Sequence, residues 1–126
     1  MRRQAVIILA LLIVCGVSTA ARHFALVKSA PAAGAKLEVS PEKIQLWFSQ
    51  LPAAGVSQLK LGLAADEKSE IAIGKTTIDA GERSMTAALS KPLAPGAYVI
   101  RWRGAGDDGH VMSGQVPFTI APYSTR

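Results

Sequence analysis

The segment Leu93-Ala-Pro-Gly-Ala-Tyr98-Val-Ile-Arg-Trp102 carries the clearest signal of the fold class. In its second half Tyr98, Ile100 and Trp102 recur every two residues, which predicts a β-strand with these side chains on its buried face. Its first half is a Pro-Gly turn, so the tyrosine stands at the head of the strand. This placement is typical of the tyrosine corner of immunoglobulin-like sandwiches, whose hydroxyl bonds to the backbone a few residues upstream. An ordinary core tyrosine is the alternative interpretation.

The same two-residue alternation recurs along the rest of the chain. Strands are predicted at 43–48, 59–63, 85–89, 98–103 and 116–120, with shorter candidates at 24–28, 71–73 and 76–79. Turn signals containing Pro or Gly separate these segments, and no window keeps a helical period. About seven or eight short strands in about 100 residues predict an all-β sandwich.

Three side chains within these strands give more local predictions. Trp102 shares the parity of Tyr98 and should be buried. Trp47 has the opposite parity to Phe48 and should be partly exposed. Pro117 lacks a backbone N–H donor, so it predicts an edge or a bulge in the last strand.

The N-terminal segment explains why 49% of the 126 residues are hydrophobic and only 18% are charged. Arg2 and Arg3 precede an apolar run of about 13 residues, shorter than the ~20 needed to span a bilayer. Small residues follow at 18–21. This order predicts a secretory signal peptide over residues 1–20, with one domain over residues 21–126. We therefore expect no stable membrane span after cleavage.

Composition also excludes several classes of function. Cys15, the single cysteine, lies in the predicted signal, so the remaining chain has no disulfide, thiolate zinc site or cysteine nucleophile. The net charge falls from +5 to +3 without Arg2 and Arg3, and the other basic residues are scattered singly. No nucleic-acid binding is expected from such a pattern. The chain also lacks a Gly-x-Ser-x-Gly elbow and a phosphate-binding glycine loop, so we expect no enzyme.

Two histidines remain as candidates for chemistry. His23 follows the predicted cleavage point, and His110 ends Asp107-Asp108-Gly109-His110 between two predicted strands. Imidazole and carboxylate are ligands for Zn, Cu and Ni. The glycine between Asp108 and His110 would let both side chains turn toward one point. A solvated histidine in an ordinary Asp-Gly hairpin turn is the simpler interpretation of this spacing.

Six motifs together resemble the CopC family of periplasmic copper-resistance proteins. They are His23-Phe-Ala-Leu26, Ser29-Ala-Pro31-Ala-Ala-Gly34, Ile44-Gln-Leu-Trp-Phe48, Gly96-Ala-Tyr98-Val-Ile-Arg-Trp102, Asp108-Gly-His110-Val-Met-Ser-Gly114 and Phe118-Thr-Ile120. The resemblance runs from His23 to about Ile120, and Asp-Gly-His followed by Ser-Gly is its most specific element.

The resemblance implies an immunoglobulin-like Greek-key sandwich of about seven strands that binds Cu(II) through His23, Asp108 and His110. It implies a periplasmic chaperone or buffer in copper tolerance, with the copper ion as ligand and an inner-membrane copper transporter as a candidate partner. Affinity should fall as the pH drops through the histidine range, because protons compete for the imidazoles. The second ring nitrogen of His110 should need a partner; Asp107 is a candidate for this role and is otherwise a solvated turn residue. The alternatives are a copper-dependent oxidoreductase with a terminal-histidine site and a metal-free structural sandwich.

The sequence departs from the family pattern in two places. The family site uses the amine of an N-terminal histidine, whereas Ala21 and Arg22 precede His23 here. A start at Ala21 would offer an amine, two amides and an imidazole, a set that can hold Cu(II) or Ni(II) in a square plane. The mature terminus therefore stays open among Ala21, Arg22 and His23. Some members carry a methionine-rich loop for Cu(I), but only Met85 and Met112 follow the predicted signal, so we expect no dedicated Cu(I) site.

Overall fold

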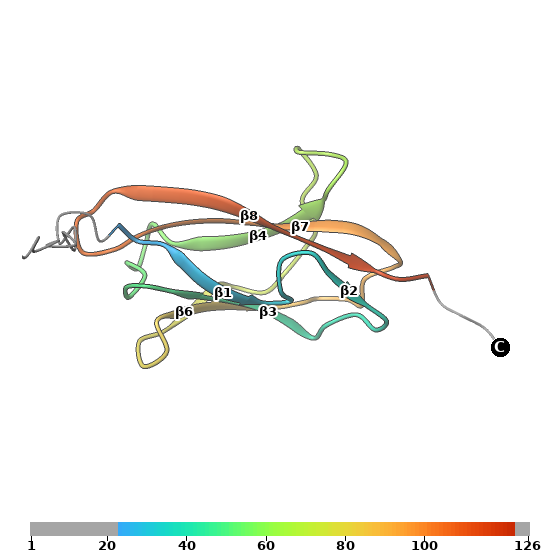
Figure 1. Ribbon diagram of the computed structural model, residues 1–126, viewed down its shortest axis with the longest axis horizontal. Helices are drawn as coiled ribbons and strands as arrows, with labels where there is room; N and C mark the ends of the chain where they lie inside the picture. Colours follow the sequence, from blue (N-terminus) through green and yellow to red (C-terminus); the bar gives the residue numbers. More distant parts are fainter. Residues whose placement is uncertain (1–22, 123–126) are drawn as a thin grey trace, which may run out of the picture.

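A computed structural model describes residues 23–122 and shows two four-stranded β-sheets that pack face to face (Figure 1). The strands are β1 (Leu26–Ala30), β2 (Ala35–Leu37), β3 (Lys43–Phe48), β4 (Gln58–Leu63), β5 (Thr77–Asp79), β6 (Ser84–Ala88), β7 (Gly96–Ala105) and β8 (Val111–Ile120). One sheet has the order β1-β3-β6-β5 and the other β2-β8-β7-β4. The predicted all-β sandwich is thus confirmed, while the predicted signal peptide at 1–20 lies outside the described residues.

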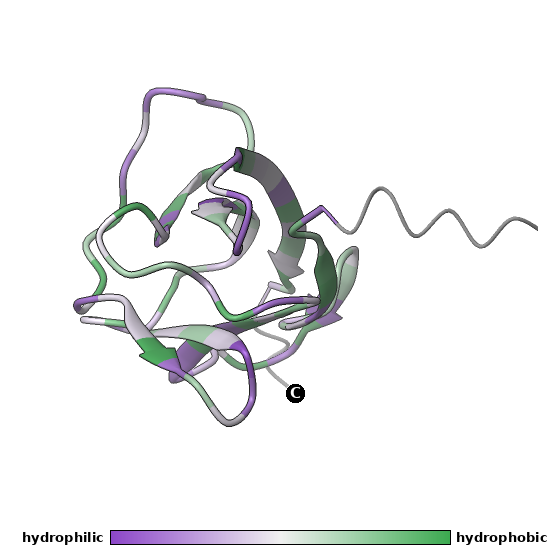
Figure 2. Ribbon diagram, turned by 90° about the vertical axis from the view of Figure 1, so that its left-hand side faces the viewer, coloured by the Kyte–Doolittle hydropathy of each residue, from purple (hydrophilic) through white to green (hydrophobic). Residues whose placement is uncertain are grey.

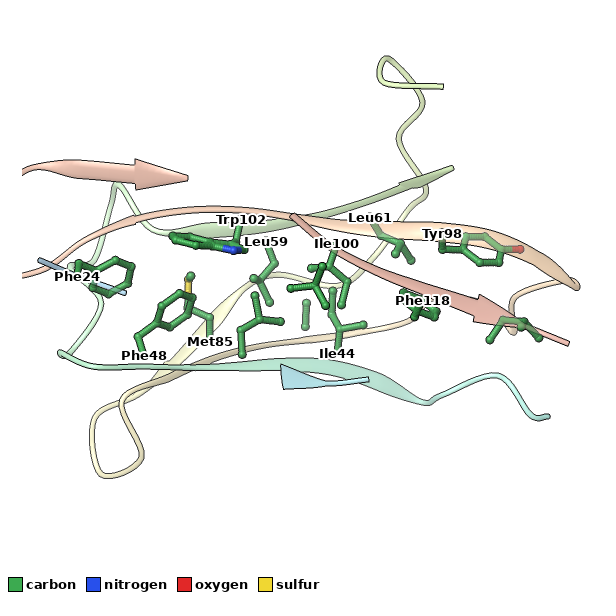
Figure 3. Close-up of a cluster of buried hydrophobic side chains, with 14 residues drawn as sticks. Phe24, Ile44, Phe48, Leu59, Leu61, Met85, Tyr98, Ile100, Trp102 and Phe118 are labelled. Atoms are coloured by element: carbon green, nitrogen blue, oxygen red, sulfur yellow. The ribbon is translucent and has the colours of Figure 1, made fainter. Parts of the chain in front are cut away.

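The core lies between the two sheets, where the inward residues of both meet (Figure 3). Ile44, Leu46 and Phe48 of β3 are at most 3% exposed, as their alternation predicts. Phe24 and Trp102 lie toward one end of the core, whereas Tyr98 and Phe118 lie toward the other (Figure 3). The inward side chains of the alternating segments therefore form one continuous apolar layer. Their burial is the main driving force for the fold.

The tyrosine corner is present. The Tyr98 hydroxyl donates a hydrogen bond of 2.5 Å to the Ala94 carbonyl, and its ring stacks on Phe118 with centroids 5.6 Å apart. Trp102 is buried, as its parity predicts. Trp47 is half-buried on the outer face of its sheet, where its indole N–H donates to Glu82 Oε2 at 3.3 Å. Both tryptophan predictions are confirmed.

The structure differs from the strand predictions at several points. The short strand β2 was not predicted; it pairs in parallel with residues 118–120 of β8. Three residues are too few for a visible alternation.

Leu63 shares the parity of Leu59 and Leu61 but is 43% exposed. It is the last residue of β4, where the chain leaves the sheet for the projecting, largely hydrophilic loop 64–70 (Figures 1 and 2).

Pro117 occupies a boundary within β8. The pairing with β7 passes through Val99 and Pro117 without a register shift, so no bulge forms there. β2 begins its pairing one residue later, at Phe118. Among the described strands, β8 pairs with β7 alone up to Pro117, and with both β7 and β2 after it. The Pro117 carbonyl accepts a hydrogen bond of 2.7 Å from the Gly34 N–H, just before β2 begins, so the missing N–H donor lies at this boundary.

Removing the Tyr98 hydroxyl should lower the free energy of unfolding by about 1 kcal/mol, because the Ala94 carbonyl loses its donor. Tyr98→Phe keeps the ring that stacks on Phe118, so it isolates the hydrogen bond. Urea unfolding followed by tryptophan fluorescence measures the change. An unchanged midpoint would show that the corner contributes no stability here.

Candidate metal centre

The three predicted ligands lie together at one end of the sandwich. His23 precedes β1, while Asp108 and His110 lie in the turn between β7 and β8. Figure 1 places the start of β1 beside this turn, and Figure 2 looks onto the same end. One nitrogen or oxygen atom from each residue can be chosen so that all three lie within 4.8 Å of one another. Segments more than 80 positions apart in sequence thus converge.

Asp108 lies between the two imidazoles. Its Oδ2 is 3.1 Å from Nδ1 of His110 and 3.7 Å from Nδ1 of His23, and the ring centroids of the histidines are 6.3 Å apart. The side chains are 54%, 36% and 74% exposed for His23, Asp108 and His110. The cluster therefore presents two nitrogen donors and a carboxylate to solvent.

The turn is shaped by its own residues. Gly109 has φ +74°, a left-handed conformation that glycine adopts without strain. This bend lets the His110 backbone N–H donate to Asp108 Oδ1 at 3.1 Å, while Asp108 Oδ2 faces the His110 ring. The predicted role of the glycine in turning both side chains to one point is confirmed.

A glutamine from the other sheet anchors the same turn. Gln50, two residues after β3, accepts a hydrogen bond of 3.0 Å from the Asp107 N–H through its Oε1. A Cβ at position 106 would overlap that oxygen, so Gly106 lets the glutamine approach the backbone. Gln50 was not predicted from the sequence, because a polar residue after a strand gives no distinctive signal.

Burial of Phe24 anchors the other half of the cluster. Phe24 is 1% exposed and stacks on Phe48 with centroids 4.5 Å apart. It also meets Trp102 edge-on at 6.1 Å. A Cβ at Gly104 would lie 2.7 Å from its ring, so only glycine leaves room there. The residue after His23 is thereby fixed inside the core, which holds the histidine at the rim.

Electrostatics favours the ionised carboxylate. The pKa of Asp108 lies below its ordinary value of 3.8, chiefly because the His110 backbone N–H donates to it, with smaller contributions from the His110 ring and from His23. Among the described residues, no hydrogen bond or ion pair joins the Asp107 carboxylate to either histidine ring. The proposed pairing of Asp107 with His110 therefore stays a prediction.

The two methionines lie in different surroundings. Met85 is fully buried in the core, as its parity predicts, and Met112 is 38% exposed opposite Gly104 on β7. Two imidazoles and a carboxylate suit Cu(II), Zn or Ni, whereas a single exposed thioether adds little soft-ligand character.

Comparison with known proteins identifies the family. The model of the CopC domain family matches residues 26–121. The chain belongs to the CopC family. It is 32% identical over 102 residues to copper resistance protein C of Pseudomonas syringae pv. tomato, covering 78% of this chain and 80% of that protein.

Two further relatives extend the comparison. The copper transport protein CutJ of Bacillus subtilis is 30% identical over 115 residues, which cover 90% of this chain. The chain spans about a fifth of the length of CutJ, because the match covers 21% of it. The crystal structure of PcoC, a methionine-rich copper resistance protein from Escherichia coli, superposes with a TM-score of 0.67 at 33% identity, covering 78% of this chain and 98% of that one. The resemblance noted from the motifs is confirmed.

The lowered pKa of Asp108 predicts how the metal-free stability depends on pH. A carboxyl whose pKa is lower in the folded state contributes stability above about pH 3.8, and that contribution disappears as the pH falls through the folded value. Asp108→Asn keeps an acceptor for the His110 N–H but removes the charge. Wild type should therefore have a slightly higher urea midpoint than the variant at pH 5 and above. The difference between the two midpoints should shrink as the pH falls below about 3.8, and a difference that grew in acid would contradict this assignment.

Proposed function

We propose that the protein binds one Cu(II) ion through His23, Asp108 and His110 and acts as a periplasmic copper chaperone or buffer. The observation that carries this proposal is the convergence of these three side chains, which include both histidines of the chain, within 4.8 Å. Membership of a family that contains copper resistance proteins supports the choice of metal.

The donor set matches the chemistry of Cu(II). This ion favours nitrogen and oxygen ligands in tetragonal geometry. Two imidazoles and one carboxylate fill three such positions, and the backbone or terminal amine near His23 is a candidate for the fourth. Because the pKa of Asp108 is lowered, its carboxylate stays ionised to a lower pH than an ordinary aspartate. Copper therefore has no proton to displace from this ligand at neutral pH.

The exposure of the cluster suits transfer rather than catalysis. All three side chains are at least 36% exposed, so a partner can reach a bound ion without opening the core. No helix of the described residues is long and apolar enough to cross a membrane. Export by the predicted signal peptide would place the domain in the periplasm, where an inner-membrane copper transporter is the candidate partner.

Removing any proposed ligand should weaken Cu(II) binding by at least about a hundredfold, since loss of groups that merely orient a ligand costs 10–100-fold. The variants are His23→Ala, Asp108→Asn and His110→Ala. The matched carboxylate control is Asp66→Asn in the exposed loop 64–70, where Asp66 Oδ1 likewise accepts from the backbone N–H two residues on. Titration against a competing chelator gives the affinities, and EPR spectra report the nitrogen ligands. Equal affinity in all five proteins would exclude this site.

The same samples separate the alternative functions. A metal-free structural sandwich would show no rise in melting temperature with Cu(II), whereas a ligand at 100 times its Kd stabilises the fold by about 2.7 kcal/mol. Ascorbate-driven peroxide formation with polysaccharide cleavage would favour the oxidoreductase. We expect stabilisation without turnover.

The mature terminus decides the fourth ligand. Intact mass of the exported protein should show a start at Ala21 or Arg22, because cleavage between Arg22 and His23 would violate the small-residue rule of signal peptidases. With a start at Ala21, deletion of Ala21 and Arg22 should change both the Cu(II) affinity and the EPR spectrum. A measured start at His23, or unchanged spectra after the deletion, would exclude the square-planar arrangement of four nitrogens.

A further inference from the structure

Ser49 connects the end of β3 to the backbone around His23. Its Oγ accepts a hydrogen bond of 3.0 Å from the Ala25 N–H and donates one of 3.2 Å to the His23 carbonyl. Its own N–H donates to the Ala25 carbonyl at 2.8 Å. The pairing of β1 with β3 begins at Leu26 and Phe48, and its register shifts between Leu26 and Lys28. One serine side chain therefore extends the strand pairing back to the candidate ligand.

Ser49 is itself held firmly. It is half-buried, and its carbonyl accepts a hydrogen bond of 3.0 Å from Arg83 Nη1. The preceding residue, Phe48, donates its N–H to the Arg83 carbonyl at 2.9 Å. The hydroxyl thus projects from a backbone that is fixed on its other side by the turn between β5 and β6. The Ser49 hydroxyl can therefore hold the neighbouring segment around His23 in position.

The imidazole of His23 depends on such backbone support. Among the described residues, its Nδ1 lies 3.7 Å from Asp108 Oδ2, and this distance is longer than a hydrogen bond. Burial of Phe24 holds this residue in the core. This single side-chain contact does not by itself set the direction of the backbone at His23. The bond from Ser49 to the His23 carbonyl restricts that direction.

We propose that Ser49 is a positioning residue for the metal site, which keeps His23 in place before the ion arrives. This inference rests on the proposed Cu(II) function and deepens it. Without the hydroxyl, the His23 carbonyl and the Ala25 N–H lose their partner, and the segment frays locally while the core stays folded. Copper binding must then order the segment at the expense of affinity.

The test compares Ser49→Ala, Ser49→Thr and Ser90→Ala in the full mature protein, with Cu(II) as the probe. Ser49→Ala should weaken Cu(II) binding about tenfold, as expected for the loss of up to two hydrogen bonds. Ser49→Thr retains the hydroxyl and should restore most of the affinity. Ser90 is an exposed serine beside Tyr98, at the other end of the core, and its replacement should leave the affinity unchanged.

A double-mutant cycle shows whether Ser49 acts through His23. In the His23→Ala background, Ser49→Ala should cause no additional loss of Cu(II) affinity. In the His110→Ala background, its tenfold effect should persist. An equal loss in the His23→Ala background would indicate a general structural role and overturn the proposal.

Hydrogen exchange in the metal-free protein provides a readout independent of copper. The Ala25 amide should exchange faster in Ser49→Ala, whereas the Asp107 amide, which donates to Gln50, should be unaffected. Faster exchange at Ala25 with unchanged Cu(II) affinity would reject the role of Ser49 and leave the proposed function intact. Failure of the wild-type protein to bind Cu(II) would reject both.

Discussion

Phe24 lies between the two sheets, stacked on Phe48 and edge-on to Trp102, and the geometry of the candidate metal centre depends on this contact. Full burial of a phenylalanine side chain contributes about 1.5–3 kcal/mol. The backbone of the neighbouring His23 is thereby held in place, although the side chain of this residue is more than half exposed. Apolar burial, rather than attraction between the polar groups, brings the first ligand to the rim.

The second ligand pair is held by different forces. Asp108 and His110 are oriented by the left-handed Gly109 and by the bond from the His110 N–H to Asp108, both within one turn. Gln50 then ties that turn to the end of β3. Because Ser49 ties the His23 segment to the same strand end, two consecutive residues outside the ligand set hold its two halves. The exposed donors need this support, since solvent screening weakens their mutual attraction.

Local sequence patterns predicted the sheets well because burial in a sandwich repeats every two residues. The buried faces of β3 and β7 follow from that period, and the turn before Tyr98 indicated the tyrosine corner. The three-residue β2 is too short to show it. The burial of Ser84 was not predicted either, because this residue lies on the outer face of its sheet, opposite Trp47, where the alternation predicts exposure.

The candidate site was predicted less directly. The spacing of Asp108 and His110 alone favoured an ordinary hairpin turn. Only the motifs shared with the family implied that His23 belongs to the same site. The contacts of Ser49 and Gln50 involve residues distant in sequence, so no local sequence pattern predicts them. The structure does supply a reason for the Ser-Gly element of the last motif: a Cβ at Gly114 would lie 2.8 Å from the Trp102 indole.

The position of the three ligands gives a bound ion a mechanical role as well. His23 leads into β1 of one sheet, while Asp108 and His110 join β7 and β8 of the other. Many immunoglobulin domains staple their two sheets with a disulfide, but the chain beyond the predicted signal has no cysteine. An ion shared by these ligands would act as a removable staple between the two layers. Loading would then stiffen that end of the sandwich against shear, and unloading would release it.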